Sequence, residues 1–145
     1  MSTSALGPKA VGWDWWSLQL SDGRELMFFL IRREDGSHEA ASGGTLVLAD
    51  GATRRLGPDD VKVEVEDVWR SPETDARYPA RWRLGLPALD LVLVVEPVLA
   101  DQEMRTSFTY WEGATRVSGT SRGRPIGGQG YVELTGYASS MRGVL

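Results

Sequence analysis

The stretch GWDWWSLQLSDGRELMFFL, residues 12–30, decides the expected fold because two largely apolar runs flank a polar turn. Asp22 and Gly23 tolerate the positive φ angles that tight hairpin turns require. Strand alternation over residues 13–20 separates two faces, and both are largely apolar. The first face carries Trp13, Trp15, Ser17 and Gln19, and the second carries Asp14, Trp16, Leu18 and Leu20. The stretch therefore predicts a β-hairpin whose first strand is covered on both sides.

The same period of two continues through the middle of the chain. Residues 61–69 place Val61, Val63, Val65 and Trp69 on one face and charged side chains on the other. Residues 80–86 place Trp82, Leu84 and Leu86 opposite Arg81 and Arg83. Such alternation indicates strands with one face in water.

Two other runs are apolar on both faces, RELMFFLIR at 24–32 and LDLVLVVEP at 89–97, so we expect them to be covered on both sides. Further Asp-Gly pairs at 35–36 and 50–51 lie between such segments. Sustained helical periodicity is missing from the sequence. The pattern predicts one all-β domain over residues 1–145, an antiparallel sandwich or barrel of eight to ten strands.

Composition excludes several classes of protein. A formal net charge of −4 argues against a nucleic-acid partner. The absence of cysteine removes disulfides, thiol catalysis and Cys-type zinc sites, and it leaves the compartment open. The longest apolar run, residues 26–31, is far shorter than the roughly 20 residues of a membrane-spanning helix. Residues 1–11 lack the basic and apolar regions of a signal peptide.

Two motifs could suggest a metal site or a phosphate-binding loop, but their sequence context supports neither. His38 has no neighbouring His or Cys, so we expect no metal site there and an exposed loop instead. GRPIGGQG at 123–130 lacks the Lys-Ser/Thr of a phosphate-binding loop, and the next segment reads as a strand. A flexible hairpin loop is the better interpretation of residues 123–130.

Two acidic-aromatic strands are more informative. Tyr110 and Glu112 share one strand face, and Tyr131 and Glu133 share another. If these faces point into a barrel lumen, either glutamate would act as a proton donor with a pKa raised by burial. The pattern alone favours the alternative, in which each glutamate is exposed or is paired with an arginine such as Arg116 or Arg83.

The tryptophans at the start of the chain allow two interpretations. A core role is the default, since each aromatic side chain buries roughly 150–250 Å². A lumen of Trp13 and Trp15 would equally suit a flat, unsaturated ligand, with Gln19 as a polar handle.

Several long segments together resemble one known family. They are STSALGPKAVGWDWWSLQLSDGRELM, GTLVLADGATRRL, WRSPETDARYPARWRLGLP, ADQEM and YWEGATRVSGTSRGRPIGGQGYVELTGY. These segments, which span Ser2 to Tyr137, resemble the lipocalin-like family that includes bacterial carotenoid 1,2-hydratase (hydroxyneurosporene synthase), many predicted secreted hydrolases and fungal kievitone hydratase. The fungal lipocalin-like decalin-forming cyclases look like more distant relatives.

The resemblance implies an antiparallel lipocalin-like (calycin) β-barrel and a full protein of two consecutive barrels, of which this chain corresponds to the second. The family pattern places an acidic-aromatic segment just before the STSAL stretch, where Met1 stands here. Because the acids proposed for hydratase chemistry lie in and near that segment, no catalytic residue is carried onto this chain. The residues expected to bind substrate are Trp13, Trp15, Gln19, Tyr110, Glu112, Tyr131 and Glu133.

The implied activity is a hydratase or cyclase reaction on a long, hydrophobic, unsaturated substrate, without a metal or an organic cofactor. Two other classes stay open. The chain would be a free-standing barrel that carries a hydrophobic ligand, or a truncated domain whose apolar first strand docks on a partner barrel or on a second copy.

Overall fold

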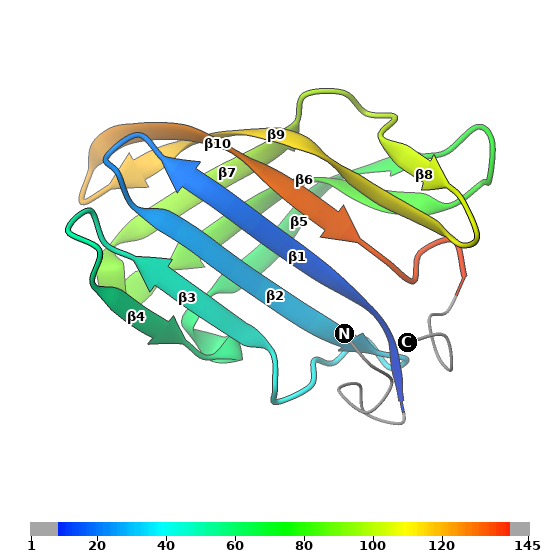
Figure 1. Ribbon diagram of the computed structural model, residues 1–145, viewed down its shortest axis with the longest axis horizontal. Helices are drawn as coiled ribbons and strands as arrows, with labels where there is room; N and C mark the ends of the chain where they lie inside the picture. The colour runs from blue at the N-terminus through cyan, green and yellow to red at the C-terminus, as the bar shows by residue number, and fades with distance from the viewer. Residues whose placement is uncertain (1–8, 140–145) are drawn as a thin grey trace.

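One strongly curled antiparallel sheet accounts for the fold (Figure 1). The computed structural model describes residues 9–139. The strand order is β4-β3-β2-β1-β10-β9-β7-β6-β5, with β8 paired to β9. The strands are β1 (Ala10–Leu20), β2 (Glu25–Arg33), β3 (Gly43–Val47), β4 (Thr53–Leu56), β5 (Lys62–Arg70), β6 (Arg77–Leu86), β7 (Leu91–Pro97), β8 (Glu103–Arg105), β9 (Thr109–Ser121) and β10 (Arg124–Leu134). Short 3-10 turns, η2 (Pro58–Asp60) and η3 (Pro87–Leu89), precede β5 and β7. The expected antiparallel, lipocalin-like architecture is confirmed as a half-barrel.

The Asp-Gly turns are where the sequence predicts them. Gly23 (φ 89°) lies between β1 and β2, and Gly51 (φ 90°) lies between β3 and β4. Gly36 (φ 86°) follows β2 in a turn closed by a bridge between Arg32 and the exposed His38. A left-handed backbone at each glycine reverses the chain without the steric penalty that a side chain would bring.

The hydrophobic core fills the inside of the curl. Trp16 is fully buried against Phe28 and meets Trp82 edge to face, with ring centroids 6.1 Å apart. Inward side chains of β3, β4, β7, β9 and β10, together with others of β1, β2 and β6, also belong to this core. Trp16 therefore has the default core role. Asp14, Trp16, Leu18 and Leu20 share one face of β1 as predicted, and the structure shows that this face is the inner one.

Alternation fails in β5, which forms one end of the sheet. Val65 pairs with the buried Trp82 before the register shifts at Asp67, yet it is exposed because β5 has no neighbouring strand on its other side. Val68, which follows the shifts, is exposed as well. The predicted grouping of Val63 and Val65 on one face therefore holds, but the expectation that Val65 is buried on that face is wrong. Bulges of this kind are common in edge strands, where they discourage pairing with other chains.

The predicted flexible loop at residues 123–130 is also wrong in extent. The turn is confined to Arg122 and Gly123, and the remaining glycines belong to β10. A Cβ on Gly128 or Gly130 would collide with backbone oxygens of β1. These glycines allow β10 to approach β1 closely. Their presence in the sequence therefore indicates close packing of two strands and not a flexible loop.

The outer face of the curled sheet is only partly covered by other parts of the chain. Leu26, Phe28 and Leu30 of β2 enter the core, whereas Met27 and Phe29 face outward. The outward Met27 is 40% exposed. Residues 24–32 are therefore covered fully on one side only, contrary to the prediction. In residues 89–97 as well, the outward Val92 and Val94 are only half-buried.

Candidate functional site

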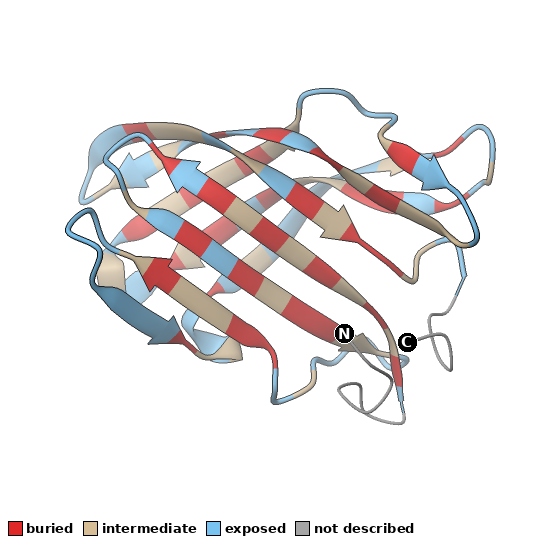
Figure 2. Cartoon of the chain, viewed as in Figure 1, coloured by how far each residue is buried: buried red, intermediate tan, exposed pale blue. Residues whose placement is uncertain are grey.

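The outward face of β1 meets β2 and β10 in a shallow aromatic hollow. Alternating buried and half-buried positions run along β1 in Figure 2, and Trp13 and Trp15 hold half-buried outward positions. Trp15 lies between Phe29 of β2 and Glu133 of β10 in the strand register. These four residues and Met27 line an open hollow of about 400 Å³. The hollow lies on the side of the sheet opposite the core.

Glu133 is the polar group of this hollow, and Trp13 fixes its position. The indole Nε1 of Trp13 donates a hydrogen bond of 2.6 Å to Glu133 Oε1. No other hydrogen bond from the described residues reaches this carboxylate. The hydrogen bond holds the Trp13 ring and the Glu133 carboxylate in one arrangement at the rim of the hollow.

Glu112 lies directly opposite Glu133 on the neighbouring strand β9. Its Oε1 accepts a hydrogen bond of 3.2 Å from the Tyr110 hydroxyl. Within residues 9–139 neither glutamate forms an ion pair, and the ion pairs of Arg83 go to Glu66 instead. The predicted pairing with arginine is therefore wrong for both glutamates, which remain half-buried and without a cation.

Two phenols complete this cluster. Tyr131 is 43% exposed on the same face as Glu133, and Tyr110 packs against Phe108 with the rings tilted and their centroids 5.1 Å apart. Burial, followed by the charge of Glu112, raises the pKa of both Tyr110 and Tyr131. Both hydroxyls therefore keep their protons at neutral pH and can donate hydrogen bonds.

Most of the residues expected from the sequence come together here, and one does not. Trp13, Trp15 and Glu133 line the hollow, and Glu112, Tyr110 and Tyr131 lie beside it on the same face. Gln19 is exposed at the other end of β1, opposite Gln129. Met27 and Phe29 also line the hollow but were not predicted from the sequence. Residues 24–32 are apolar on both strand faces, and this pattern could have indicated that one apolar face lies outside the core.

The hollow continues across β2 toward β3. A second open depression of about 370 Å³ shares Met27 and Phe29 and extends over residues 40–45 to Arg55. The apolar hollow therefore continues into a depression of mixed polar and apolar lining, and the two glutamates lie at the opposite end.

A buried ionic cluster lies on the inner side, close to the hollow. The Asp14 carboxylate accepts hydrogen bonds of 2.7 Å from Arg32 Nη1 and from the Tyr137 hydroxyl. Arg32 also lies 3.9 Å from the centre of the Tyr137 ring and donates to the Thr135 carbonyl oxygen at 2.7 Å. Burial raises the pKa of Asp14, although Arg32 and Tyr137 partly oppose this effect. The cluster joins β1, β2 and the segment after β10.

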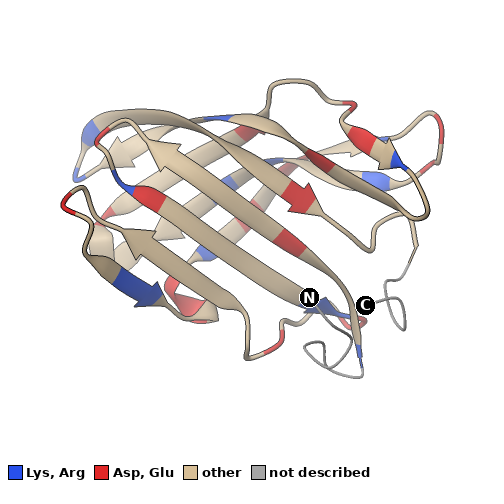
Figure 3. Cartoon of the chain, in the orientation of Figure 1, with Lys and Arg blue, Asp and Glu red and all other residues tan. Residues whose placement is uncertain are grey.

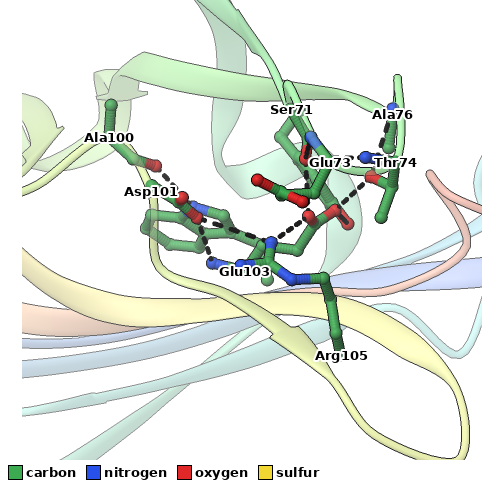
Figure 4. Close-up of polar contacts among 10 residues, drawn as sticks. Ser71, Glu73, Thr74, Ala76, Ala100, Asp101, Glu103 and Arg105 are labelled. Carbon is green, nitrogen blue, oxygen red and sulfur yellow. Dashed lines mark hydrogen bonds and ion pairs between the residues drawn. The ribbon is translucent and has the colours of Figure 1, made fainter.

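A second polar cluster surrounds Glu103 of β8, whose side chain is fully buried (Figure 4). Its carboxylate accepts hydrogen bonds of 2.6–2.7 Å from Ser71, Thr74, Tyr78 and Arg105. Burial raises the pKa of Glu103, but these four hydrogen bonds outweigh it, so the net shift is downward. All available acceptor positions point at protein donors, which indicates a structural role for this carboxylate.

Metal-binding clusters and membrane-spanning helices are both missing from the described part of the chain. Residues 9–139 contain no group of three or more His, Cys, Asp or Glu side chains arranged to hold a metal ion. Among these residues there is also no helix long and apolar enough to cross a membrane.

Comparison with known proteins places this geometry in a family. The model of the AttH-like family matches residues 1–137. A crystal structure described as an AttH from Nitrosomonas europaea is 40% identical, with a TM-score of 0.78, and the match covers 91% of this chain and 41% of that one. Kievitone hydratase from Nectria haematococca is 20% identical with a TM-score of 0.72, covering 90% of this chain and 40% of that one, and shows a shared fold.

The chain spans about two-fifths of the length of these two solved relatives. A comparison with curated proteins finds no match. Kievitone hydratase, named by the sequence resemblance, is thus a structural neighbour, whereas the relation to carotenoid 1,2-hydratase stays a prediction. The family model and the 40% identical structure together show that this chain belongs to the AttH-like family.

Proposed function

We propose that this chain is a lipocalin-like barrel domain of a hydratase- or isomerase-type protein, corresponding to the second of two barrels. Its outer hollow forms one wall of a binding site for a long, hydrophobic, unsaturated ligand. The observation that carries the proposal is the hollow of Trp13, Trp15, Met27 and Phe29, with the Glu133 carboxylate held at its rim. The structural likeness to kievitone hydratase supports the hydratase class.

The groups present suit the addition of water to an alkene. An acid protonates one alkene carbon, water adds its oxygen to the cation, and a base removes the extra proton from that water. Glu133 is the group in the hollow that can hold or receive a proton, and the faces of Trp13 and Trp15 stabilise positive charge nearby. Apolar contacts over Met27 and Phe29 orient the chain of the substrate.

The open shape of the hollow leaves part of the site to be supplied from elsewhere. The solved relatives are more than twice as long as the part that this chain matches. Together with the exposure of Met27 and Tyr131, this supports a partner barrel, or a second copy, that covers the hollow. A free-standing carrier of hydrophobic ligands is the second candidate, favoured by the apolar lining of the hollow on β1 and β2.

A ligand titration tests the proposal. All-trans-retinol, a neutral polyene, accepts excitation energy from nearby indoles, so binding is read from tryptophan fluorescence. We expect Trp15→Leu to weaken binding about tenfold, because the loss of aromatic contact costs roughly 1.5 kcal/mol. Trp69→Leu, which removes an indole from β5, is the matched control and leaves the affinity unchanged. Equal affinities in the parent and in Trp15→Leu would refute the proposed binding site.

The reaction class is tested separately. A product heavier by one water, formed by the chain or by the chain with its covering domain, would support a hydratase. Its formation is expected to stop in Glu133→Gln. Retinol binding without conversion of any polyene tested, with and without that domain, would instead support the carrier.

A further inference from the structure

The two glutamates beside the hollow form an uncompensated pair of negative charges. Glu112 and Glu133 are directly opposite one another on β9 and β10, a position in which Cβ atoms are about 4.5–5.5 Å apart. Figure 3 shows an acidic segment on each of the neighbouring strands β9 and β10. Like charges in such a cross-strand pair destabilise a sheet. Because no described cation neutralises either residue, the arrangement is electrostatically complementary to a positive charge from outside.

The hollow next to this pair supplies a second, independent feature. Its floor is apolar, formed by Trp15, Met27 and Phe29, and the Trp13 ring stands at the Glu133 end. Tyr110 and Tyr131 lie on the same outer face near the glutamates. Aromatic faces attract organic cations, most strongly when the cation is partly removed from water. An apolar floor with an acidic, aromatic end therefore matches a ligand that is both flat and cationic.

An inorganic cation fits this place poorly. Calcium requires six to eight oxygen ligands and magnesium an octahedron of oxygens. Apart from Glu133, the hollow is lined by carbon-rich side chains and a thioether. A desolvated metal ion would find too few oxygen ligands here, whereas an alkylammonium group needs no fixed coordination shell.

We infer that the hollow binds an organic cation whose charged group lies at Glu133 and Glu112 and whose apolar body lies over Trp15, Met27 and Phe29. The inference rests on the proposed function because it uses the same hollow and narrows its ligand class. A neutral polyene would use the apolar floor alone. A cationic ligand would use the floor and the acidic end together.

Phenyltrimethylammonium and tert-butylbenzene provide a sharp test, since they differ only in a charged nitrogen replacing a carbon. Binding is measured by calorimetry or by tryptophan fluorescence at low ionic strength. We expect the cation to bind at least about fivefold more tightly than its neutral isostere, from the combined attraction of the carboxylates and the rings. Glu133→Gln removes most of this preference without changing the affinity for tert-butylbenzene. Glu25→Gln, an exposed carboxylate at the far end of β2, leaves the preference intact.

The outcomes separate the two proposals. Equal affinity for both compounds, or a preference that survives in both Glu133→Gln and Glu112→Gln, overturns the cation site. Trp15→Leu must weaken both compounds, and a normal urea midpoint confirms that each variant is folded. A failure of retinol binding overturns the proposed function, while a cation preference that depends on Glu133 still supports the site.

Discussion

Replacing Glu103 by glutamine gives the most direct test of what stabilises the described barrel. The two carboxylate oxygens each accept two hydrogen bonds, Oε1 from Ser71 and Arg105 and Oε2 from Thr74 and Tyr78. A glutamine amide nitrogen cannot accept, so two donors lose their acceptor in either orientation. Hydrogen bonds to a charged group contribute about 1.5–3 kcal/mol each, and the low end applies because hydroxyls can reorient. We expect Glu103→Gln to lower the free energy of unfolding by about 3 kcal/mol at pH 7.

The pH dependence provides an independent check on the same reasoning. Because the pKa of Glu103 is lowered in the folded protein, its contribution is present above the unfolded value of about 4.3 and is lost as the pH falls. Urea unfolding followed by tryptophan fluorescence should therefore show a smaller difference between variant and parent near pH 3 than at pH 7. Glu73→Gln, an exposed neighbour in the same loop, is the control. A difference below about 1 kcal/mol at pH 7, or one independent of pH, would refute the reasoning.

Three further predictions concern the ionic cluster, the glycines and the hollow. Arg32→Met should cost about 3–5 kcal/mol at neutral pH, since it leaves Asp14 buried without its cation. Because burial raises the pKa of Asp14, protonation at acidic pH should reduce this cost, and urea unfolding at neutral and acidic pH measures the difference. Gly119→Ala should lower the thermal midpoint more than Gly113→Ala, because a Cβ at Gly119 meets a backbone oxygen of β7 and one at Gly113 meets only a flexible glutamine side chain. A fluorescent dye for apolar surfaces should bind the parent and bind Trp15→Ser several-fold more weakly, and unchanged dye binding would place the exposed apolar surface elsewhere.

Local patterns predict much of this fold because each hairpin depends on short-range chemistry. The alternation over residues 13–20 correctly separates Trp16 from Trp13 and Trp15, and the glycine turns follow from backbone freedom. The pattern predicts the correct face for Val65 but not its exposure, because a short-range pattern does not state that β5 lies at the end of the sheet. It also fails at Gly128 and Gly130, whose role is visible only once β10 lies against β1.

The candidate site was predictable as a set of residues that share a face, but its location was not. Period two places Trp15 and Glu133 on one side of their strands without stating which side becomes the core. That choice depends on the summed packing of all the strands, including the distant Trp82. The clusters around Asp14 and Glu103 depend on contacts between segments far apart in the chain, and no short motif predicts them.

The two-sided character of β1 has a consequence for how such a domain changes over evolutionary time. Trp16 and Leu18 hold the fold together from one side, while Trp13 and Trp15 face the hollow from the other. Substitutions on the outer side leave the packing of the inner side nearly untouched. The outer face of β1 can therefore change at little cost in stability, whereas changes at Trp16 or Leu18 disturb the core. Alternate residues of this one strand are therefore under different physical constraints, packing on the inner side and surface chemistry on the outer side.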